Sequence, residues 1–225
     1  MKNQIPDDLA SLYAGASTRV RSHAALRWRS CPFESVAERV PESGKILDVG
    51  CGHGLLAARL AMTSPRRRVL GIDVATDKVF AAQAAAEDAA RRGISNLEFR
   101  RTAPGELPAG PWSAIVFVDV LYLLPPTDQE RLLRAAAKSL GPGGVLLVKE
   151  VSNRPRAKAL WAYLQEIAAV HVLGITEGRG VRILPPAAQA AWLESERLQV
   201  EHVALDRGYP HPHHLIVARR TASRA

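Results

Sequence analysis

The sequence predicts one α/β domain with a mostly parallel seven-stranded sheet, helices on both faces of that sheet and an antiparallel last strand. The chain has 225 residues, the size of a single domain with one sizeable core. Over residues 41–151, short runs rich in Val, Ile and Leu alternate with helix-length segments, which favours right-handed crossovers and a parallel sheet. A short join between the last two extended runs favours an antiparallel hairpin.

The expected elements follow in order along the chain. Residues 7–30 predict one or two helices, and residues 33–39 predict a short helix between two prolines. Strands are then expected at 45–50, 67–74, 96–101, 112–120 and 145–151. Helices are expected at 54–64, 76–92, 127–140 (closed by the sequence GPGG), 155–172 and 186–196. The two hairpin strands are expected at 198–206 and 213–220, and the stretch before the last helix, 173–185, is irregular.

Charge and composition limit the classes of function. Lys and Arg number 30 against 22 Asp and Glu, a net charge of +8 that favours nucleic acid, anionic lipid or an acidic substrate, although a solvated basic surface explains it as well. Residues 1–10 lack the apolar core of a signal peptide and no apolar run reaches about 18 residues, so we expect no transmembrane segment. Cys31 and Cys51 stand in unlike contexts, which predicts free thiols and a cytoplasmic protein.

The stretch ILDVGCGHG, residues 46–54, carries an acid near the end of a strand and then a backbone with few side chains. In an open parallel sheet, ligands bind beyond the carboxyl ends of the strands. Gly50, Gly52 and Gly54 let the backbone approach a ligand, and free amides at the start of the following helix favour an anionic group. The stretch also fits the dinucleotide pattern G-x-G-x-x-G/A, but Asp48 inside the strand and the lack of a Tyr-x-x-x-Lys pair weigh against a nicotinamide dinucleotide.

This motif resembles the glycine motif of class I S-adenosylmethionine-dependent methyltransferases of the small-molecule type. GID at 71–73, IVFVDVLYLLP at 115–125 and LGPGGVLLVKE at 140–150 are similar to further motifs of that family, in the same order. The resemblance implies a Rossmann-like methyltransferase fold, with S-adenosyl-L-methionine as cofactor and S-adenosyl-L-homocysteine as product. We therefore expect one methyltransferase domain over 1–225, divided into an N-terminal helical cap (1–40), a cofactor-binding half (41–151) and a substrate-side half with the β-hairpin (152–225).

The resemblance also implies roles for the residues of the motif. Gly50, Cys51, Gly52 and Gly54 form the loop that cradles the methionine part of the cofactor. Asp48 either holds this loop or binds the amino group of the cofactor through water.

The second strand is expected to hold the nucleoside part of the cofactor. Asp73, at the end of that strand, accepts from both ribose hydroxyls unless it serves only as a helix cap, and Val74 packs on the adenine. Where the family often carries Asp-Ala after the third strand, this chain has Thr102 and Ala103. Either Thr102 or a backbone carbonyl replaces the acid that meets the adenine amino group, or the adenine is held more loosely. Asp119, after the fourth strand, completes the expected cofactor-binding set.

Methyl transfer from a sulfonium needs alignment, and a base where the acceptor loses a proton. The expected candidates for this role are Asp119 and Tyr122 after the fourth strand, and Lys149 and Glu150 on the fifth. Because side chains alternate along a strand, either Lys149 or Glu150 faces the site, but not both. The sequence DVLYLLPP lacks the Asp/Asn-Pro-Pro-aromatic order of enzymes that methylate exocyclic amines or amides, which lowers the case for those acceptors.

The turn YPHPHH, residues 209–214, brings several histidines together. Their irregular spacing and the absence of a neighbouring carboxylate or cysteine argue against a metal site, and we expect none. The turn joins a parallel strand to a reversed one and so lies on the cofactor side, where His211 or His213 can act as a base. A plain hairpin turn explains the same residues.

The N-terminal segment is expected to cover the pocket. Tyr13, Arg19, His23, Arg27 and Trp28 make a basic roof that suits an anionic acceptor, although a helix packed on the sheet with its arginines in water fits equally well. The main hypothesis is an enzyme that methylates a small metabolite or lipid-like molecule. An RNA methyltransferase and a cofactor-binding scaffold without catalysis stay open as alternatives.

Overall fold

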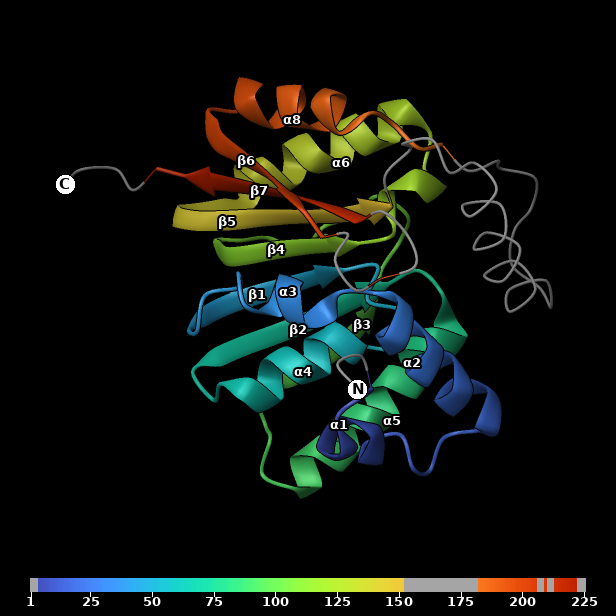
Figure 1. Cartoon of the computed structure of the whole chain (residues 1–225). Coiled ribbons are helices and arrows are strands. Elements are labelled where there is room, and N and C mark those ends of the chain that lie inside the picture. The colour runs from blue at the N-terminus through green and yellow to red at the C-terminus, as the bar shows by residue number, and fades with distance from the viewer. Residues whose placement is uncertain (1–3, 152–181, 206–208, 210–212, 222–225) are drawn as a thin grey trace.

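Seven strands form one sheet in the order β3-β2-β1-β4-β5-β7-β6, in a computed structural model that describes residues 4–151, 182–205, 209 and 213–221 (Figure 1). All neighbouring strands from β3 to β5 pair in parallel, whereas β7 runs antiparallel to both β5 and β6. The strands are β1 (Gly44–Val49), β2 (Arg67–Asp73), β3 (Leu97–Arg101), β4 (Trp112–Val118), β5 (Leu140–Val151), β6 (Leu198–Ala204) and β7 (His213–Arg220). The predicted parallel sheet with a reversed last strand is confirmed.

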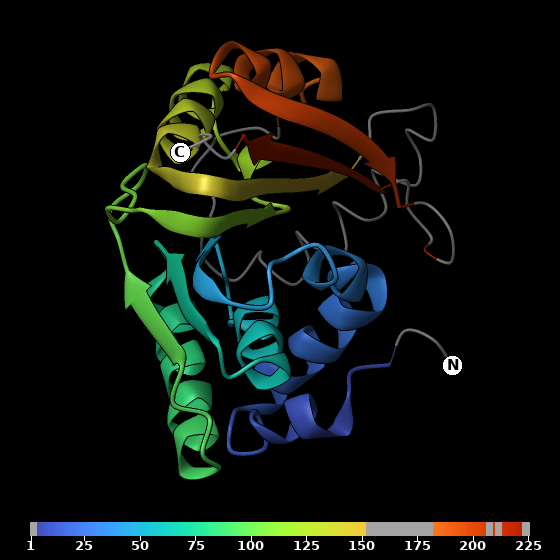
Figure 2. The same ribbon diagram turned by 90° about the vertical axis from the view of Figure 1, so that its left-hand side faces the viewer.

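Helices cover both faces of the sheet, with α6 and α8 on one side and the helices of the N-terminal part on the other (Figure 2). The helical elements are α1 (Asp7–Ser11), α2 (Thr18–Ser30), α3 (Phe33–Ala37), α4 (Leu55–Thr63), α5 (Thr76–Arg91), the 3-10 turn η1 (Leu121–Leu123), α6 (Pro126–Ser139) and α8 (Pro186–Ser195).

The alternation of side chains along each strand creates two separate cores. In β1, Ile46 belongs to the cluster under α1–α5 and Leu47 to the cluster under α6 and α8, and neither is exposed. In β5, Leu147 and Val148 divide in the same way. Each such buried side chain contributes about 1.5–3 kcal/mol to folding, and the two layers hold the strand ends in fixed positions.

One predicted boundary is wrong. The helix expected at 127–140 ends at Ser139, and the GPGG sequence does not close it but lies inside β5. Leu140 already pairs with Trp112 of β4, and a register shift between Trp112 and Ala114 accommodates the glycines. The helix expected at 155–172 and most of the irregular stretch that follows lie outside the described residues. Within the ranges that the structure describes, no helix has both the length and the apolar character needed to cross a membrane.

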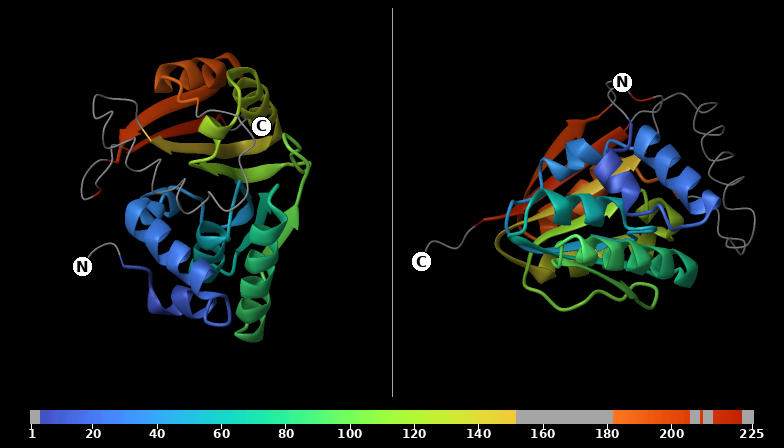
Figure 3. Two further views of the ribbon diagram at one scale, coloured as in Figure 1. Left: turned by 90° about the vertical axis from the view of Figure 1, so that its right-hand side faces the viewer. Right: turned by 90° about the horizontal axis from the view of Figure 1, so that it is seen from below.

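The carboxyl ends of the parallel strands meet at one edge of the sheet, which faces the viewer in the left view of Figure 3. The reversed β7 begins at this same edge, because His213 pairs with Val151 at the end of β5. The N-terminal helices also reach this edge. The fold therefore places the ends of several strands, the start of β7 and the N-terminal helices around one region, where ligands bind in open parallel sheets.

Candidate active site

The loop between β1 and α4 has a left-handed backbone at each glycine of the motif. The φ angles are +72° at Gly50, +56° at Gly52 and +82° at Gly54, a region that residues with a side chain rarely adopt. The amides of Gly50 and Cys51 donate to the carbonyl of Ile72 at 2.8 and 3.0 Å. The loop is therefore fixed to β2, and its conformation depends on glycine.

The three glycines differ in their surroundings. A Cβ atom on Gly50 would lie 2.5 Å from Cγ2 of Val120, and a Cβ atom on Gly54 would overlap the ring of Phe99. A Cβ atom on Gly52 would meet no atom within 4 Å. Packing alone thus explains Gly50 and Gly54, whereas Gly52 borders open space that a ligand can occupy.

Asp73 ends β2 and contacts the same loop. Its Oδ2 atom accepts a hydrogen bond from the Gly52 amide at 2.9 Å, and its Oδ1 atom accepts one from the Ala75 amide at 2.9 Å, just before α5. Each carboxylate oxygen has capacity for a further hydrogen bond, as a pair of ribose hydroxyls would need. Val74 follows it and is 49% exposed. The loop-holding and ligand-binding roles of Asp73 are therefore compatible.

Asp48 lies inside β1 and is 2% exposed. Burial, followed by the charge of Asp73, raises the pKa of Asp48 to about 7, although the amide of Ala57 favours the ionised form. The Oδ2 atom of Asp48 is buried without a hydrogen-bond partner among the described residues. A buried carboxyl oxygen in this state is costly unless a ligand supplies a donor or a cation.

Side chains from the N-terminal helices cover the glycine loop. The hydroxyl of Tyr13 donates to the carbonyl of His53 at 2.8 Å, and burial raises the pKa of this tyrosine. The ring of His23, on α2, lies 4.7 Å from the ring of His53. The loop is therefore held from β2 on one side and from the N-terminal segment on the other.

The segment after β3 carries a carboxylate that the sequence motifs did not single out. The Thr102 amide donates to the carbonyl of Asp73 at 3.1 Å, which brings this segment beside the end of β2. The Ala103 amide donates to Oε2 of Glu106 at 3.1 Å. Glu106 thus places an acid next to the position at which the expected acid is missing. Only its spacing of three residues from Ala103 could have indicated this.

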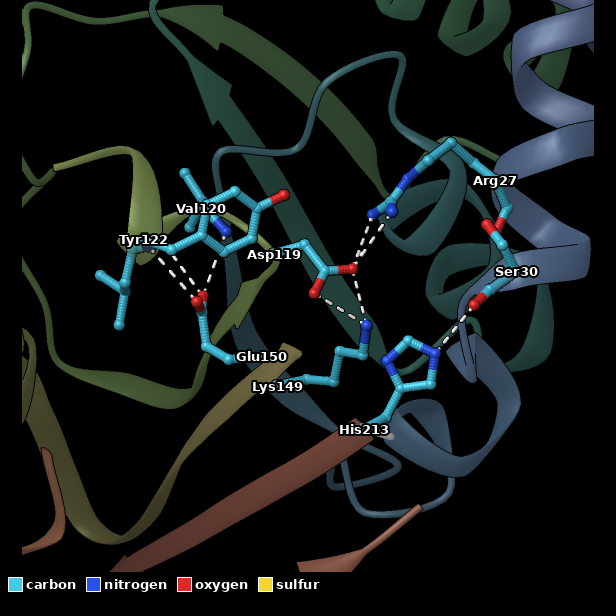
Figure 4. Close-up of polar contacts among 9 residues, drawn as sticks. Arg27, Ser30, Asp119, Val120, Tyr122, Lys149, Glu150 and His213 are labelled. Atoms are coloured by element: carbon cyan, nitrogen blue, oxygen red, sulfur yellow. Dashed lines mark hydrogen bonds and ion pairs between the residues drawn. The ribbon is translucent and has the colours of Figure 1, made fainter. Parts of the chain in front are cut away.

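Asp119 follows β4 and binds two cations (Figure 4). Nζ of Lys149 lies 2.8 Å from Oδ1 and 2.6 Å from Oδ2 of Asp119, and the guanidinium of Arg27 contacts Oδ2 at 3.1 Å. Burial alone would raise the pKa of Asp119, but Lys149, Arg27 and His213 outweigh it and lower the pKa to about 2. Asp119 is therefore an ion-pair partner throughout the neutral pH range.

Glu150 holds the segment after Asp119 from the other face of the sheet (Figure 4). Its carboxyl oxygens accept hydrogen bonds from the amides of Val120, Leu121 and Tyr122 at 3.2, 3.0 and 3.3 Å. Burial and the nearby Asp119 charge raise the pKa of Glu150 to about 8. The side chain of Tyr122 is itself buried.

Histidine at the start of β7 completes the cluster at this edge. His213 is buried, and its Nε2 atom lies 3.0 Å from the carbonyl of Ser30 at the end of α2. The ring of Tyr209 meets the ring of His213 edge-on at 5.6 Å. His211 lies outside the described residues. Among the residues that the structure describes, no three His, Cys, Asp or Glu side chains gather in a metal-binding arrangement.

The expected site residues thus form two neighbouring groups. Asp48, the glycine loop and Asp73 surround the ends of β1 and β2, whereas Asp119, Lys149 and His213 gather at the ends of β4 and β5 and the start of β7. Val120 joins the groups, because its side chain packs against Gly50. Glu150 and Lys149 point to opposite faces, as alternation requires, yet both contact residues 119–122. The sequence named Arg27 as part of the roof, but its pairing with Asp119 links residues 92 positions apart and was missed.

Comparisons with known proteins show which family the chain matches. A family model described as "Methyltransferase domain" matches residues 22–196. The "Ubiquinone biosynthesis O-methyltransferase" of Xanthomonas axonopodis pv. citri (strain 306) is 31% identical over 176 residues, which cover 76% of this chain and 70% of that protein. The protein of the same name from Xylella fastidiosa (strain 9a5c) is 31% identical over 173 residues, or 76% of this chain and 68% of the relative.

Solved structures share the fold at lower sequence identity. An O-methyltransferase family protein from Burkholderia thailandensis superimposes with a TM-score of 0.72 at 17% identity, over 95% of this chain. The match spans 63% of that protein, which is less than two thirds of its length. Magnesium protoporphyrin IX methyltransferase from Synechocystis PCC 6803, solved with bound S-adenosylhomocysteine, superimposes with a TM-score of 0.63 at 17% identity, over 96% of this chain and 94% of that protein.

Proposed function

Because this chain belongs to the class I methyltransferase family, whose members use S-adenosylmethionine, we propose that it transfers the methyl group of that cofactor to an oxygen atom of a small organic acceptor. The observation that carries the proposal is the open space beside Gly52, whose amide binds the carboxylate of Asp73. The buried Oδ2 atom of Asp48, in the strand before this loop, has no hydrogen-bond partner among the described residues. The sulfonium of the bound cofactor supplies a methyl group that is ready for displacement.

The residues around the glycine loop fit such a cofactor. Asp48 accepts from its ammonium group, which satisfies the buried Oδ2 atom and favours the ionised carboxylate. The first amides of an α-helix have no partner within the helix, and at the start of α4 those not used by Asp48 suit the carboxylate of the cofactor's methionine part. Asp73 uses its remaining acceptor capacity for the ribose hydroxyls, and Val74 offers an exposed apolar surface to the adenine.

The acceptor side is basic, and we assign an anionic or lipid-like acceptor to it. Arg19, His23 and Arg27 follow one another at intervals of four residues, so they share one face of α2. On this face His23 reaches the glycine loop and Arg27 reaches Asp119. Arg19, Arg27 and Lys149 bring basic side chains to this part of the described chain, which supports an acceptor with an acidic group. The oxygen acceptor is carried over from the names of the curated relatives.

The alternative of an RNA substrate finds little support in the arginine clusters that motivated it. Arg66 pairs with Glu42 at 2.6 Å, Arg92 with Asp88 at 3.6 Å and Arg100 with Glu98 at 2.5 Å. Neighbouring acids therefore compensate part of the charge in three of these clusters. A phosphate-binding surface needs basic side chains that are available to phosphates.

The proposal also places the enzyme in the cytoplasm. Both cysteines are free thiols, with Cys31 buried and Cys51 partly buried. Free thiols suit a reducing compartment.

Labelled-methyl transfer tests the proposal. Purified protein is incubated with methyl-labelled S-adenosylmethionine and separately with 3,4-dihydroxybenzoate, catechol, a fatty alcohol and bulk RNA at about 0.15 M salt, the ionic strength at which phosphate-driven binding is judged. We expect label in a small acceptor, with the acidic catechol preferred over the neutral one. Label in RNA alone would contradict the small-molecule proposal. Binding of the cofactor without transfer to these probes or to fractionated cell extract would favour the scaffold alternative.

A further inference from the structure

The carboxylate of Asp119 connects three parts of the molecule. Lys149 binds it from β5 and Arg27 binds it from α2, while Asp119 itself is the first residue after β4 (Figure 4). The side chains of Lys149 and Asp119 are 0% and 1% exposed, and that of Arg27 is 17% exposed. Two cations and one anion are thus removed from most of the solvent.

Such a buried cluster of charges contributes little net stability to a fold. Desolvation of charged groups offsets most of the attraction between them, and well-packed apolar side chains often replace them at no loss of stability. Asp119 adds a second cost, because its φ angle of +54° is left-handed and it is not glycine. Two costs at one residue, next to the residue that packs on the glycine loop, indicate a functional requirement for this geometry.

Lys149 fixes the left-handed turn from two directions. Its backbone carbonyl accepts from the Asp119 amide at 2.9 Å, while its ammonium group binds the Asp119 carboxylate. The next residue, Val120, packs against Gly50 in the glycine loop. A shift of Asp119 would therefore move Val120 and, with it, the loop that borders the cofactor space.

Arg27 connects the same carboxylate to α2. This helix also touches the glycine loop through the His23–His53 ring contact, and β7 through the contact of Ser30 with His213. The ring of Phe33 lies 5.7 Å from the Arg27 guanidinium, which adds a cation–π contact. Along α2, the Arg27–Asp119 contact lies between the contact of His23 with His53 and that of Ser30 with His213.

We propose that Lys149 and Arg27 are positioning residues that act through Asp119: Lys149 sets the turn that supports the glycine loop, and Arg27 docks α2 as the wall of the acceptor pocket. The proposal rests on the methyltransferase function proposed above for this site. It predicts that the two cations have different effects, although both bind one carboxylate. Loss of Lys149 lowers the affinity for the cofactor and the turnover rate. Loss of Arg27 lowers the local stability of α2 and raises KM for the acceptor.

Hydrogen exchange measured by mass spectrometry tests the structural part without an acceptor. The full chain is compared as wild type, Arg27→Met and Lys149→Met, each with and without S-adenosylhomocysteine. Arg29→Met is the matched control, because Arg29 lies on the same helix and is exposed. In Arg27→Met we expect exchange about tenfold faster over residues 18–30, a change that corresponds to a loss of about 1.4 kcal/mol in local stability. In Lys149→Met we expect the faster exchange over residues 119–122.

Binding and kinetics test the functional part. Calorimetry with S-adenosylhomocysteine should show a roughly tenfold loss of affinity in Lys149→Met and a change below about threefold in Arg27→Met. Against the best acceptor among the probes named above, Arg27→Met should raise KM about tenfold, whereas Lys149→Met should lower kcat. The conservative variants Arg27→Lys and Lys149→Arg should each recover part of the loss, which a purely structural defect elsewhere would not predict.

The outcomes separate the two proposals. Wild-type exchange over residues 18–30 in Arg27→Met, or equal effects of both variants on cofactor affinity and KM, would overturn the positioning roles. If Lys149→Met does not fold, Lys149→Arg is compared with Arg27→Met instead, and Asp119→Asn, which weakens both contacts, should show both effects together. A wild-type protein that binds no S-adenosylhomocysteine would refute the proposed function, whereas the expected change in α2 exchange would still be measured on the protein alone.

Discussion

Glu150 accepts a hydrogen bond from the backbone amide of Leu121 at 3.0 Å, and the same carboxyl group also binds the amides on either side of it. The turn after β4 is therefore held by its backbone from one face of the sheet, while Lys149 holds the Asp119 side chain from the other face. Two consecutive residues of β5 thus fix one turn, and neither is exposed by more than 3%.

The raised pKa of Glu150 predicts a pH-dependent stability. The pKa is about 8 in the folded protein and near 4.5 when unfolded, so this group stabilises the fold fully below pH 4.5 and loses that contribution as pH rises toward 8. The free energy of unfolding should fall in wild type by at most about 1.4 kcal/mol per pH unit from this group. Urea denaturation at pH 5, 6.5 and 8 should show a smaller fall in Glu150→Gln. The exposed Glu201→Gln serves as control, and equal pH slopes in wild type and Glu150→Gln would contradict the prediction.

Asp48 predicts a pH-dependent affinity for the cofactor. Its pKa of about 7 in the free protein means that much of it is protonated at pH 6 and ionised at pH 8. An ammonium group favours the ionised form, so the affinity for S-adenosylhomocysteine should increase from pH 6 to pH 8, and binding should release a proton. Asp48→Asn should bind about tenfold more weakly at pH 8 and show little pH dependence. Calorimetry in two buffers of different ionisation enthalpy measures both effects.

An equal pH dependence in wild type and Asp48→Asn would assign the titration to another group. Because the folded pKa of Asp48 is also raised, its ionisation destabilises the free protein between about pH 4 and pH 7. The variant should therefore lose less stability than wild type over that range. This second readout does not depend on the cofactor.

A substitution at Gly52 should separate the loss of cofactor affinity from the loss of stability. Gly52→Ala and Gly93→Ala both place a side chain at a positive φ angle in open space, so each should cost about 1–2 kcal/mol in stability. Only Gly52 borders the proposed cofactor space, so only Gly52→Ala should also weaken S-adenosylhomocysteine binding, by about tenfold or more. Thermal unfolding and calorimetry on the two variants test this. A loss of affinity in Gly93→Ala of similar size would show that strain alone explains the effect.

Gly54→Ala provides the opposite case. Its Cβ atom would overlap the ring of Phe99, so the substitution should lower stability by more than Gly52→Ala does, by about 1–3 kcal/mol beyond the backbone cost. The sequence motif treats the glycines as one cradle. The structure divides them into packing positions and one position that faces open space.

The alternation of short apolar runs with helices was enough to predict the sheet and the reversal of β7, because side-chain burial and short connections determine both. The GPGG sequence was assigned wrongly to a helix end, since glycines can close a helix or lie in a strand and only the pairing of Leu140 with Trp112 decides between them. The proximity of the glycine loop and Asp73 could be predicted from the sequence, because they lie at the ends of two consecutive parallel strands.

The contacts around Asp119 could not be predicted from the sequence. Arg27 and Asp119 are 92 residues apart, and their pairing depends on how α2 crosses the sheet. The left-handed turn at Asp119 has no sequence signal either, since glycine is the residue expected there. Alternation along β5 predicted that Lys149 and Glu150 face opposite sides, but not that the turn after β4 lies within reach of both.

The central claim is that the glycine loop and Asp73 bind one S-adenosylmethionine molecule. Titration calorimetry of S-adenosylhomocysteine into wild type, Asp73→Ala and the exposed control Asp77→Ala tests it most directly. We expect binding by wild type and Asp77→Ala, and an affinity at least tenfold lower in Asp73→Ala, or about 1.4 kcal/mol. No binding by the folded wild-type protein, or equal affinity in wild type and Asp73→Ala, would contradict the account.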